Sequence, residues 1–533
     1  MTTLTPYRPP APAGRDGFGQ VLHAEWTKFH TVRGWIVGMI VAIIVTAGLG
    51  VLVAKTSGQG SCTASTSSGQ SQSVPCGGGP VYPLGPGGEP VNDQFYFVRQ
   101  PLAGNGSITV RVTSLTGASS NTGLNPLGRP VLLPWAKAGI IIKDGTTQGS
   151  PYAAMMVTGG NGVRMQWNYT ADTPGLPGAV SAKSPRWLRL TRDGDSITGY
   201  DSADGTHWTQ VGTVTLAGLP ATVQAGMFAT SPVYETYSSS LGVGNINTSS
   251  TQATGTFDHL SRTGDWPASG WTGEYIIGPT EMGVNGNGYH QAAGQFTVSG
   301  SGDIGPLLGG PGMSEGGGDI TLRDYLYGTF AGLIAVAVVA AMFMTSEYRR
   351  GLIRTTLAAS PNRGRVLAAK AIVIGSVAFV TGLVAAAIAV IVGKRVAHLG
   401  SELYPTPWPT ELRMIVGTAA AVAVIAVLTL AIATIVRRSA TTILIVVVAV
   451  VIPTVVSIPP GIPSSVTEWL LRVTPAAGLA VQQAVPQYYQ VQANYIPSTG
   501  FFPLAPWTGF AVLCAWTALA LALAAYLLRR RDA

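Results

Sequence analysis

The chain has 533 residues, enough for two or three domains, and 46% of them are hydrophobic while only 11% are charged. A charged share this low indicates a membrane protein, and 68 glycines and 36 prolines indicate β-rich or loop-rich segments beside the membrane parts. The formal net charge of +8 does not indicate nucleic-acid binding, because the sequence has no basic patch interleaved with aromatic residues. We therefore expect a membrane part and a separate non-membrane part.

An amphipathic helix is the first predicted element and closes the N-terminal region, residues 1–34. Apolar residues recur at helical spacing from Phe18 onward, and the stripe includes Trp26. We expect this stripe to lie in the membrane interface, with Glu25 and Lys28 off the stripe. The alternative is a merely extended start of the first membrane span.

Six apolar runs are long enough to cross a hydrocarbon core of about 30 Å, which takes roughly 20 residues of helix. None of them contains Asp, Glu, Lys, Arg or His. Ion-driven carriers usually place acids or histidines inside the bilayer, so these runs favour an energy source outside the spans. The predicted spans are 35–54, 325–344, 371–393, 414–436, 440–459 and 506–528.

A polar block rich in Gly, Ser, Thr and Asn separates the first two spans. Its first part, residues 55–92, is predicted to be a Gly/Ser-rich linker. Cys62 and Cys76 lie in this linker, where an oxidising exterior permits a disulfide. Such a bridge would contribute about 3 kcal/mol in the chain-entropy model. The alternative is two free thiols.

Short alternating apolar runs follow over residues 93–262, such as SITVRV at 107–112 and GVRMQWNY at 162–169. Asp-Gly pairs between these runs predict hairpin turns. Evenly spaced short strands favour an all-β sandwich or jelly roll. We interpret residues 263–322 as a β-rich extension that ends in a Gly-rich linker.

The β segment resembles the concanavalin-A-like jelly rolls that are attached to bacterial surface proteins. Such domains often bind glycans, and Trp167 and Trp208 are the candidate sugar-stacking residues here. The alternative is that both rings pack in the sandwich core. Acids on the hairpin turns are favoured there for backbone reasons, so we expect no glycosidase site. The resemblance rests on FYFVRQPLAGNGSITVRV, WAKAGIIIKD, PRWLRLTRDGDSITGYDSADGTHWTQVG and TFDHL.

The connector between the second and third spans concentrates positive charge. Further cations precede the first span and follow the fourth and sixth, so all four groups lie on one side of the membrane. The positive-inside rule makes that side the cytoplasm of a multi-pass cell-membrane protein. Both termini would then be cytoplasmic and residues 55–322 extracellular. The connector's cations are Arg349, Arg350, Arg354, Arg363, Arg365 and Lys370.

The sequence of the connector predicts a short cationic helix. Good helix formers fill Gly351 to Ala359, and Ser360-Pro361-Asn362 ends the helix because Pro disfavours helical geometry in the residue before it. Charge alone leaves two interpretations open. The cations either enforce topology and touch lipid phosphates, or they also contact a partner protein.

Two membrane segments resemble actinobacterial permease subunits of type-2 ATP-binding-cassette (ABC) exporters. They are VLHAEWTKFHTVRGW at 21–35 and TSEYRRGLIRTTLAASPNRGRVLAAKA at 345–371. EWLLRVTPAAGLAVQQAVPQY at 468–488 shares this resemblance. It implies an interfacial elbow helix before the first span, a coupling helix at 346–368 that docks into an ATPase subunit, and a second permease copy or relative, as in a homodimer. It assigns the ATPase contact to Glu347, Tyr348, Arg349, Arg350, Gly351, Arg354 and Thr355.

No G-x-x-x-x-G-K-[ST] phosphate loop occurs, so ATP and Mg²⁺ would bind to the separate ATPase and this chain would hold no cofactor or metal. The leading hypothesis is a transport subunit, not an enzyme. Its fold would be an all-α bundle of six transmembrane helices (35–54 and 323–533) with an extracellular all-β jelly roll inserted between helices 1 and 2. The alternative is a membrane-anchored cell-surface protein that binds a carbohydrate or protein ligand without transport.

Overall fold

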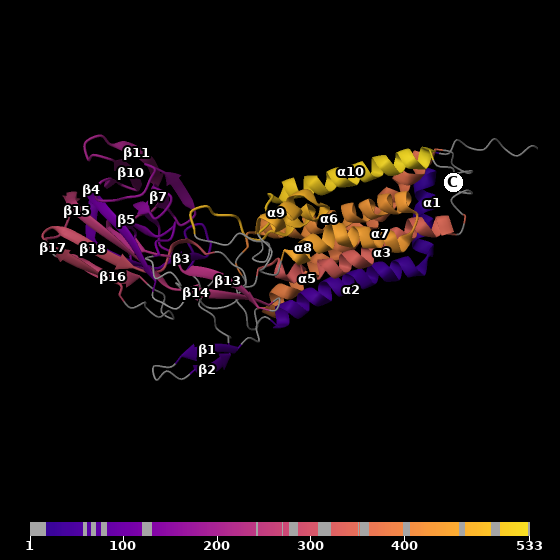
Figure 1. Cartoon of the computed structure of the whole chain (residues 1–533), viewed down its shortest axis with the longest axis horizontal. Helices are drawn as coiled ribbons and strands as arrows, with labels where there is room; N and C mark the ends of the chain where they lie inside the picture. Colours follow the sequence, from indigo (N-terminus) through magenta and orange to yellow (C-terminus); the bar gives the residue numbers. More distant parts are fainter. Residues whose placement is uncertain are drawn as a thin grey trace, which may run out of the picture. The chain divides into compact units, whose positions relative to one another are not determined.

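The computed structural model describes most of the chain, and its contacts divide the chain into two compact units. The helical unit comprises Met1–Gly77, Ile320–Val485 and Tyr495–Ala533, and the β unit comprises Gly78–Asp319 and Pro486–Asn494. Figure 1 labels their helices and strands. The described residues are 17–56, 61–65, 71–75, 83–119, 131–240, 243–268, 270–276, 286–307, 321–349, 351, 362–397, 404, 406–457, 464–491 and 501–530.

Within these described residues, six helices are long and apolar enough to cross a membrane, which confirms the six predicted spans. They cover Arg33–Lys55, Asp324–Tyr348, Arg363–Val396, Trp408–Val436, Ser439–Val456 and Pro506–Arg530. The helical elements are α1 Phe18–Thr31, α2 Arg33–Thr56, η2 Asp324–Leu326, α3 Thr329–Arg349, α5 Arg363–Ala397, α6 Trp408–Val436, α7 Ser439–Val446, η3 Val447–Val451, α8 Ile452–Val456, α9 Ser464–Val473, η4 Pro475–Gln482 and α10 Pro506–Arg530.

The β unit is built on a large antiparallel sheet of 13 strands. Its main path runs β11-β10-β9-β4-β12-β5-β6-β7-β8, and β15 to β18 join it through β4 and β15. The strands are β3 Val91–Asp93, β4 Phe95–Ser119, β5 Lys137–Lys143, β6 Tyr152–Thr158, β7 Val163–Trp167, β8 Ala171–Pro174, β9 Arg186–Asp193, β10 Ser196–Ser202, β11 Thr209–Thr215, β12 Thr222–Thr230, β13 Tyr234–Ser240, β14 Val243–Ser249, β15 Thr251–Asp265, β16 Thr272–Ile276, β17 Gly288–Ala292, β18 Gln295–Gly300 and β19 Ile304–Pro306.

The long strand β4 organises the sheet. Its first half pairs with β12 and β16, and its second half pairs with β9 and β15. Gly104, with φ of +62°, lies where the ladders change, a conformation that glycine adopts without strain. The sheet is therefore nearly closed and sandwich-like, which confirms the predicted all-β unit; the jelly-roll assignment stays a prediction. Because β18 pairs with β15, the same sheet continues beyond residue 262.

Both faces of the central strands are covered by apolar side chains. One buried cluster, which includes Ile140 and Met155, fills the sandwich interior. A second cluster, which includes Phe97, Ile141 and Phe228, lies on the opposite side of the same strands. Burial on both faces explains why β5, KAGIIIK, is a continuous buried run without polar alternation.

A separate hairpin carries the first predicted disulfide residue. β1, Ser61–Ser65, pairs with β2, Ser71–Pro75, and the register places Cys62 opposite Val74. Cys76 follows β2 directly but lies outside the described residues. The Cys62–Cys76 disulfide therefore stays a prediction.

Candidate functional site

Four charged side chains gather where three helices of the helical unit meet. Glu25 and Lys28 are about one turn apart on α1, Glu347 lies in the last turn of α3, and Lys370 lies in the first third of α5. We call these four residues the ion network. Because α3 and α5 flank residues 350–362, the network joins both helices that bound the predicted coupling connector.

Lys370 is the centre of the ion network. Its Nζ donates to Glu25 Oε2 at 2.6 Å and to Glu347 Oε1 at 2.7 Å. Lys28 Nζ donates to the same two carboxylates, at 2.7 Å to Glu25 and at 3.1 Å to Glu347. Two positive and two negative groups therefore alternate, and the set is neutral overall while it links α1, α3 and α5.

Burial makes these contacts more than surface ion pairs. Lys370 is 0% exposed and Glu25 is 1% exposed. The Phe343 ring centroid lies 4.7 Å from Lys370 Nζ, and Phe29 and Trp35 pack edge-on against Phe343. This aromatic cover keeps water from the lysine, so each charge depends on its partners. Removal of one partner from such a buried group typically costs about 3–5 kcal/mol.

Lys28 is the most exposed member of the network, with a side chain that is 38% exposed. Burial lowers the pKa of Lys28, but the hydrogen bonds and charges of Glu25 and Glu347 outweigh burial, so the pKa is raised above 10.5. Lys28 therefore remains charged throughout the physiological pH range and helps to balance the two carboxylates.

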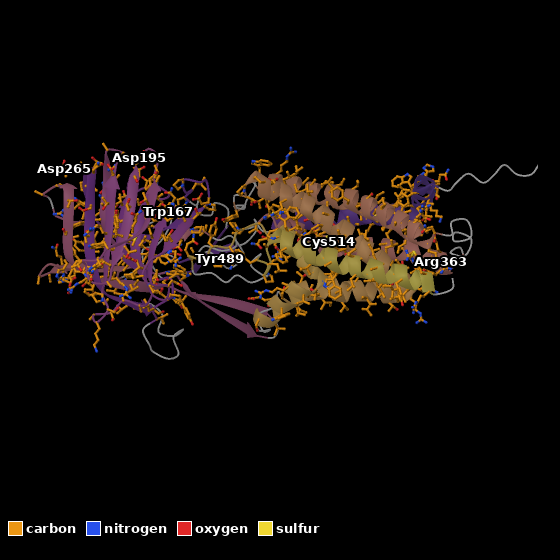
Figure 2. All side chains as sticks on the ribbon, turned by 90° about the horizontal axis from the view of Figure 1, so that it is seen from above. Trp167, Asp195, Asp265, Arg363, Tyr489 and Cys514 are labelled. Carbon is orange, nitrogen blue, oxygen red and sulfur yellow. The ribbon has the colours of Figure 1, made fainter. Side chains whose placement is uncertain are left out.

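The two helices that flank the connector are tied to further spans at the same end. At the end of α3, the Tyr348 ring lies 5.0 Å from the guanidinium of Arg437, which ends α6 in a left-handed conformation. At the start of α5, Arg363 Nη1 donates to the Leu528 carbonyl of α10 at 2.5 Å. Figure 2 shows Arg363 at this end of the helical unit. A displacement of the connector would therefore reach α1, α6 and α10.

The structure places only part of the predicted ATPase contact. Glu347 is buried and bonded to this chain's own lysines, and Tyr348 is partly buried against Arg437. Gly351 turns the chain after α3 with φ of +67°. For Arg349 only the backbone is described, and Arg350, Arg354 and Thr355 lie outside the described residues. The ATPase contact itself stays a prediction.

A helix is present at the predicted place as α1, and its location in the membrane interface stays a prediction. Glu25 and Phe29 are the buried residues of α1, and Trp26 is 48% exposed. Within the helical unit, Glu25 therefore lies on the buried face of α1. The reason is Lys370, which is 345 positions away in the sequence and lies opposite this face of α1.

Lys370 itself was missed as a site residue, because its position beside an apolar run favoured a topology role. The one available signal was charge balance. Glu347 is the sole acid of a strongly cationic connector, and Glu25 is the sole acid of residues 18–32. Carboxylates in such places call for buried cationic partners.

The candidate glycan residues of the β unit are engaged in intramolecular contacts. The guanidinium of Arg189 lies 3.8 Å from the Trp208 ring centroid, and Trp208 Nε1 donates to the Gly205 carbonyl at 3.1 Å. Trp167 packs partly buried against the sandwich core. Packing against the core is therefore seen for Trp167, whereas Trp208 is in contact with Arg189 and its own turn, and a glycan contact stays a prediction for both.

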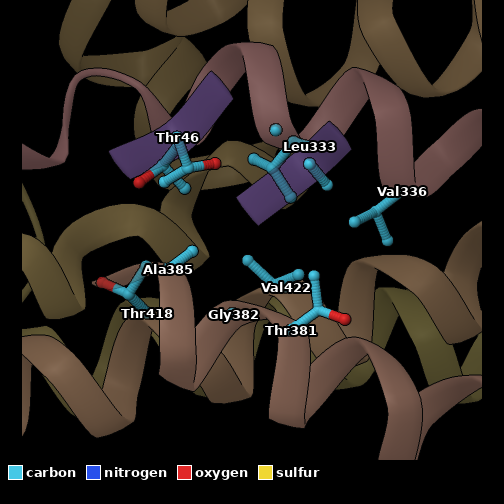
Figure 3. A pocket seen from close by; sticks show the side chains of 11 residues that line it. Thr46, Leu333, Val336, Thr381, Gly382, Ala385, Thr418 and Val422 are labelled. Atoms are coloured by element: carbon cyan, nitrogen blue, oxygen red, sulfur yellow. The ribbon is translucent and has the colours of Figure 1, made fainter. Parts of the chain in front are cut away.

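A small cavity lies among the spans, between α2, α3, α5 and α6 (Figure 3). Its interior space of about 10 Å³ is close to the minimum for one water molecule. Thr46, Thr381 and Thr418 contribute to the lining, and Gln482 donates to Thr418 at 3.3 Å nearby. This cavity is too small to hold an organic cargo. In the described part of the chain, no cluster of three or more His, Cys, Asp or Glu residues could hold a metal.

Similarities to solved structures concern part of the chain only. They include a functionally unknown protein from Saccharomyces cerevisiae (14% identity, 36% of this chain and 84% of that one, TM-score 0.19). Scytalido-glutamic peptidase is also similar, with 9% identity over 39% of this chain and 98% of that one and a TM-score of 0.22. Sheep galectin-11 is similar with 10% identity over 30% of this chain and 96% of that one and a TM-score of 0.15. None of these TM-scores supports a fold assignment or an activity. No curated protein matches the chain.

Six apolar helices and a large sandwich-like sheet define the chain as a multi-pass membrane protein with a substantial β unit. The family model for ABC-2 family transporter proteins matches residues 200–533, which is more than half of the chain. The chain belongs to this ABC-2 transporter family. As a member, it is a membrane subunit of an ABC transporter and is not itself the catalytic chain.

Proposed function

We propose that this chain is the permease subunit of an ABC exporter and that a separate ATPase moves its spans through the connector. The observation that carries the proposal is the ion network. It joins α1 to the two helices that bound residues 350–362, and Lys370, Glu25 and Glu347 are too buried to serve merely as topology signals. A push on the connector would therefore be passed to three helices together.

In this scheme the contact residues and the transmitting residues are different. Arg349, Arg350, Gly351, Arg354 and Thr355 contact the ATPase, while Glu347 works within the chain. The cationic groups also orient the protein, so the end of the spans that carries α1 faces the cytoplasm and the β unit lies outside. A second permease copy completes the transport path, and ATP and Mg²⁺ bind to the partner.

The test is co-purification of the ATPase with charge-reversed permease. Arg350→Glu together with Arg354→Glu is expected to abolish both co-purification and transport-coupled ATP hydrolysis, while membrane insertion stays normal. The matched control is Arg472→Glu on α9, an exposed arginine that pairs with Glu468 on the same helix. Undiminished co-purification of the double variant would refute the proposed function.

A further inference from the structure

The chain enters and leaves the main sheet of the β unit through a small two-stranded ladder. β3 and β19 pair antiparallel, with Asp93 opposite Ile304. Two buried lysines of β5 hold this ladder in place. Lys143 Nζ donates to Asp93 Oδ2 at 2.8 Å, and Lys137 Nζ donates to Asp303 Oδ1 at 2.7 Å. Both lysines are 0% exposed, so the ladder is firmly fixed to the sheet.

Two residues from a distant part of the sequence, Gln490 and Val491, are buried in the same region of the β unit. Gln490 is 5% exposed, and its Nε2 donates to the Thr170 carbonyl at 2.6 Å. Val491, also 5% exposed, packs on β19, where a Cβ added to Gly305 would lie 2.7 Å from Val491 Cγ1. Thr170 follows Tyr169, whose hydroxyl donates to Asp93. Gln490 and Val491 are therefore anchored next to the β3–β19 ladder.

The preceding residues are anchored equally firmly in the helical unit. All of η4 is buried, and Ala484 and Val485 are each 4% exposed. Gln482 donates to the hydroxyls of Thr329 and Thr418, each at 3.3 Å. Irregular backbone inside a membrane protein is stable where protein buries it in this way.

Only residues 486–489 separate these two anchors. A fully extended chain of this length spans at most about 17 Å between Val485 and Gln490. The other connections between the units run through 57–82, 308–320 and 492–500 and are all longer. Residues 486–489, which we call the strap, therefore set the tightest covalent limit on movement between the β unit and η4.

We propose that the strap couples the β unit mechanically to η4, so that a restraint on the β unit alters the packing of η4 among the spans. The β unit then serves as a control element for the helical unit. This inference goes beyond the proposed function and does not depend on the ATPase, because both anchors lie in this chain.

The test lengthens the strap in the full chain. Insertion of Gly-Ser-Gly-Ser after Gln487 is expected to speed hydrogen exchange of the η4 amides by at least about threefold, because η4 loses its restraint. The matched control inserts the same residues after Pro311, in a longer connection. A second variant, Gln490→Ala, releases the anchor without a change in length and is expected to speed η4 exchange in the same direction.

Two outcomes decide the inference. Faster η4 exchange for the strap insertion and Gln490→Ala, but not for the control insertion, supports it. Unchanged η4 exchange in a strap variant whose β-unit amides keep their protection overturns it. The readout needs no ATPase, so a failure of the co-purification test leaves this inference intact, and the reverse also holds.

Discussion

Lys370 is the residue that holds α1, α3 and α5 together in the ion network. It bonds to two carboxylates from two other helices and lies against an aromatic ring, while it is fully buried. Replacement by a neutral residue leaves Glu25 and Glu347 bonded to Lys28, which is partly exposed. The loss is therefore larger than that of an ordinary ion pair.

Lys370→Met is expected to lower the free energy of unfolding by about 3–5 kcal/mol. The matched control is Lys394→Met, in the same helix, because Lys394 is partly exposed and pairs with Glu411 at 2.8 Å. Exposed pairs contribute less than about 1 kcal/mol. Thermal unfolding of both purified full-length variants measures the difference. Equal losses in the two variants would show that the ion network has no special role in stability.

Asp258 offers a pH-dependent test in the β unit. Arg111 donates to its two carboxylate oxygens at 2.8 and 2.7 Å, and these hydrogen bonds lower the pKa of Asp258 below 3.8. A carboxyl with a depressed folded-state pKa stabilises above the unfolded value and loses that contribution as pH falls through the folded value. Asp258→Asn should therefore be less stable than the natural chain at pH 7, and the gap should close below pH 3.8. Denaturant unfolding of the β unit within the full chain checks this, and a gap independent of pH would contradict it.

At the scale of elements, the packing of α2 depends on where its glycines lie. A Cβ added at Gly50 would lie 2.2 Å from the Tyr325 carbonyl oxygen in η2, whereas nothing lies within 4 Å of a Cβ added at Gly48. The first contact is with backbone, which cannot rotate away. The two glycines are two residues apart in one helix, so they form a matched pair.

Gly50→Ala is expected to destabilise the helical unit by about 1–3 kcal/mol, because the extra methyl group would push η2 away from α2. Gly48→Ala should be neutral or stabilising by up to about 1 kcal/mol, since alanine is the better helix former. Thermal unfolding of the two variants gives the comparison. Stabilisation by both substitutions would mean that α2 and η2 separate without cost.

The elements themselves were largely predictable from the sequence, because spans and strands follow from local patterns. The apolar runs predicted all six spans, and the alternation of apolar and polar residues between Asp-Gly turns predicted the sheet. The bond between Glu25 and Lys370 could not be predicted in this way, because the two residues are 345 positions apart and lie on different helices. The anchoring of Gln490 in the β unit was missed for the same reason, because its contact with Thr170 joins positions 320 residues apart.

At the scale of the whole molecule, the orientation of the spans decides whether the connector can meet an ATPase. Cations lie before α2, around the connector, after α6 and after α10, and the ion network lies among the first two of these groups. If the positive-inside rule holds, the connector meets a cytoplasmic ATPase and the β unit meets the exterior. The opposite orientation would leave the connector without access to ATP-driven work.

Labelling with a membrane-impermeant maleimide tests this orientation in intact cells. In a background with Cys62, Cys76 and Cys514 replaced, Gln291→Cys on β17 should react without permeabilisation, because this position is exposed on the β unit. Trp26→Cys on α1, which is also exposed, should react only after the membrane is opened. Reaction of both cysteines in intact cells would place α1 outside. That result would remove the connector from the reach of a cytoplasmic ATPase, while the coupling of the strap to η4 would be unaffected.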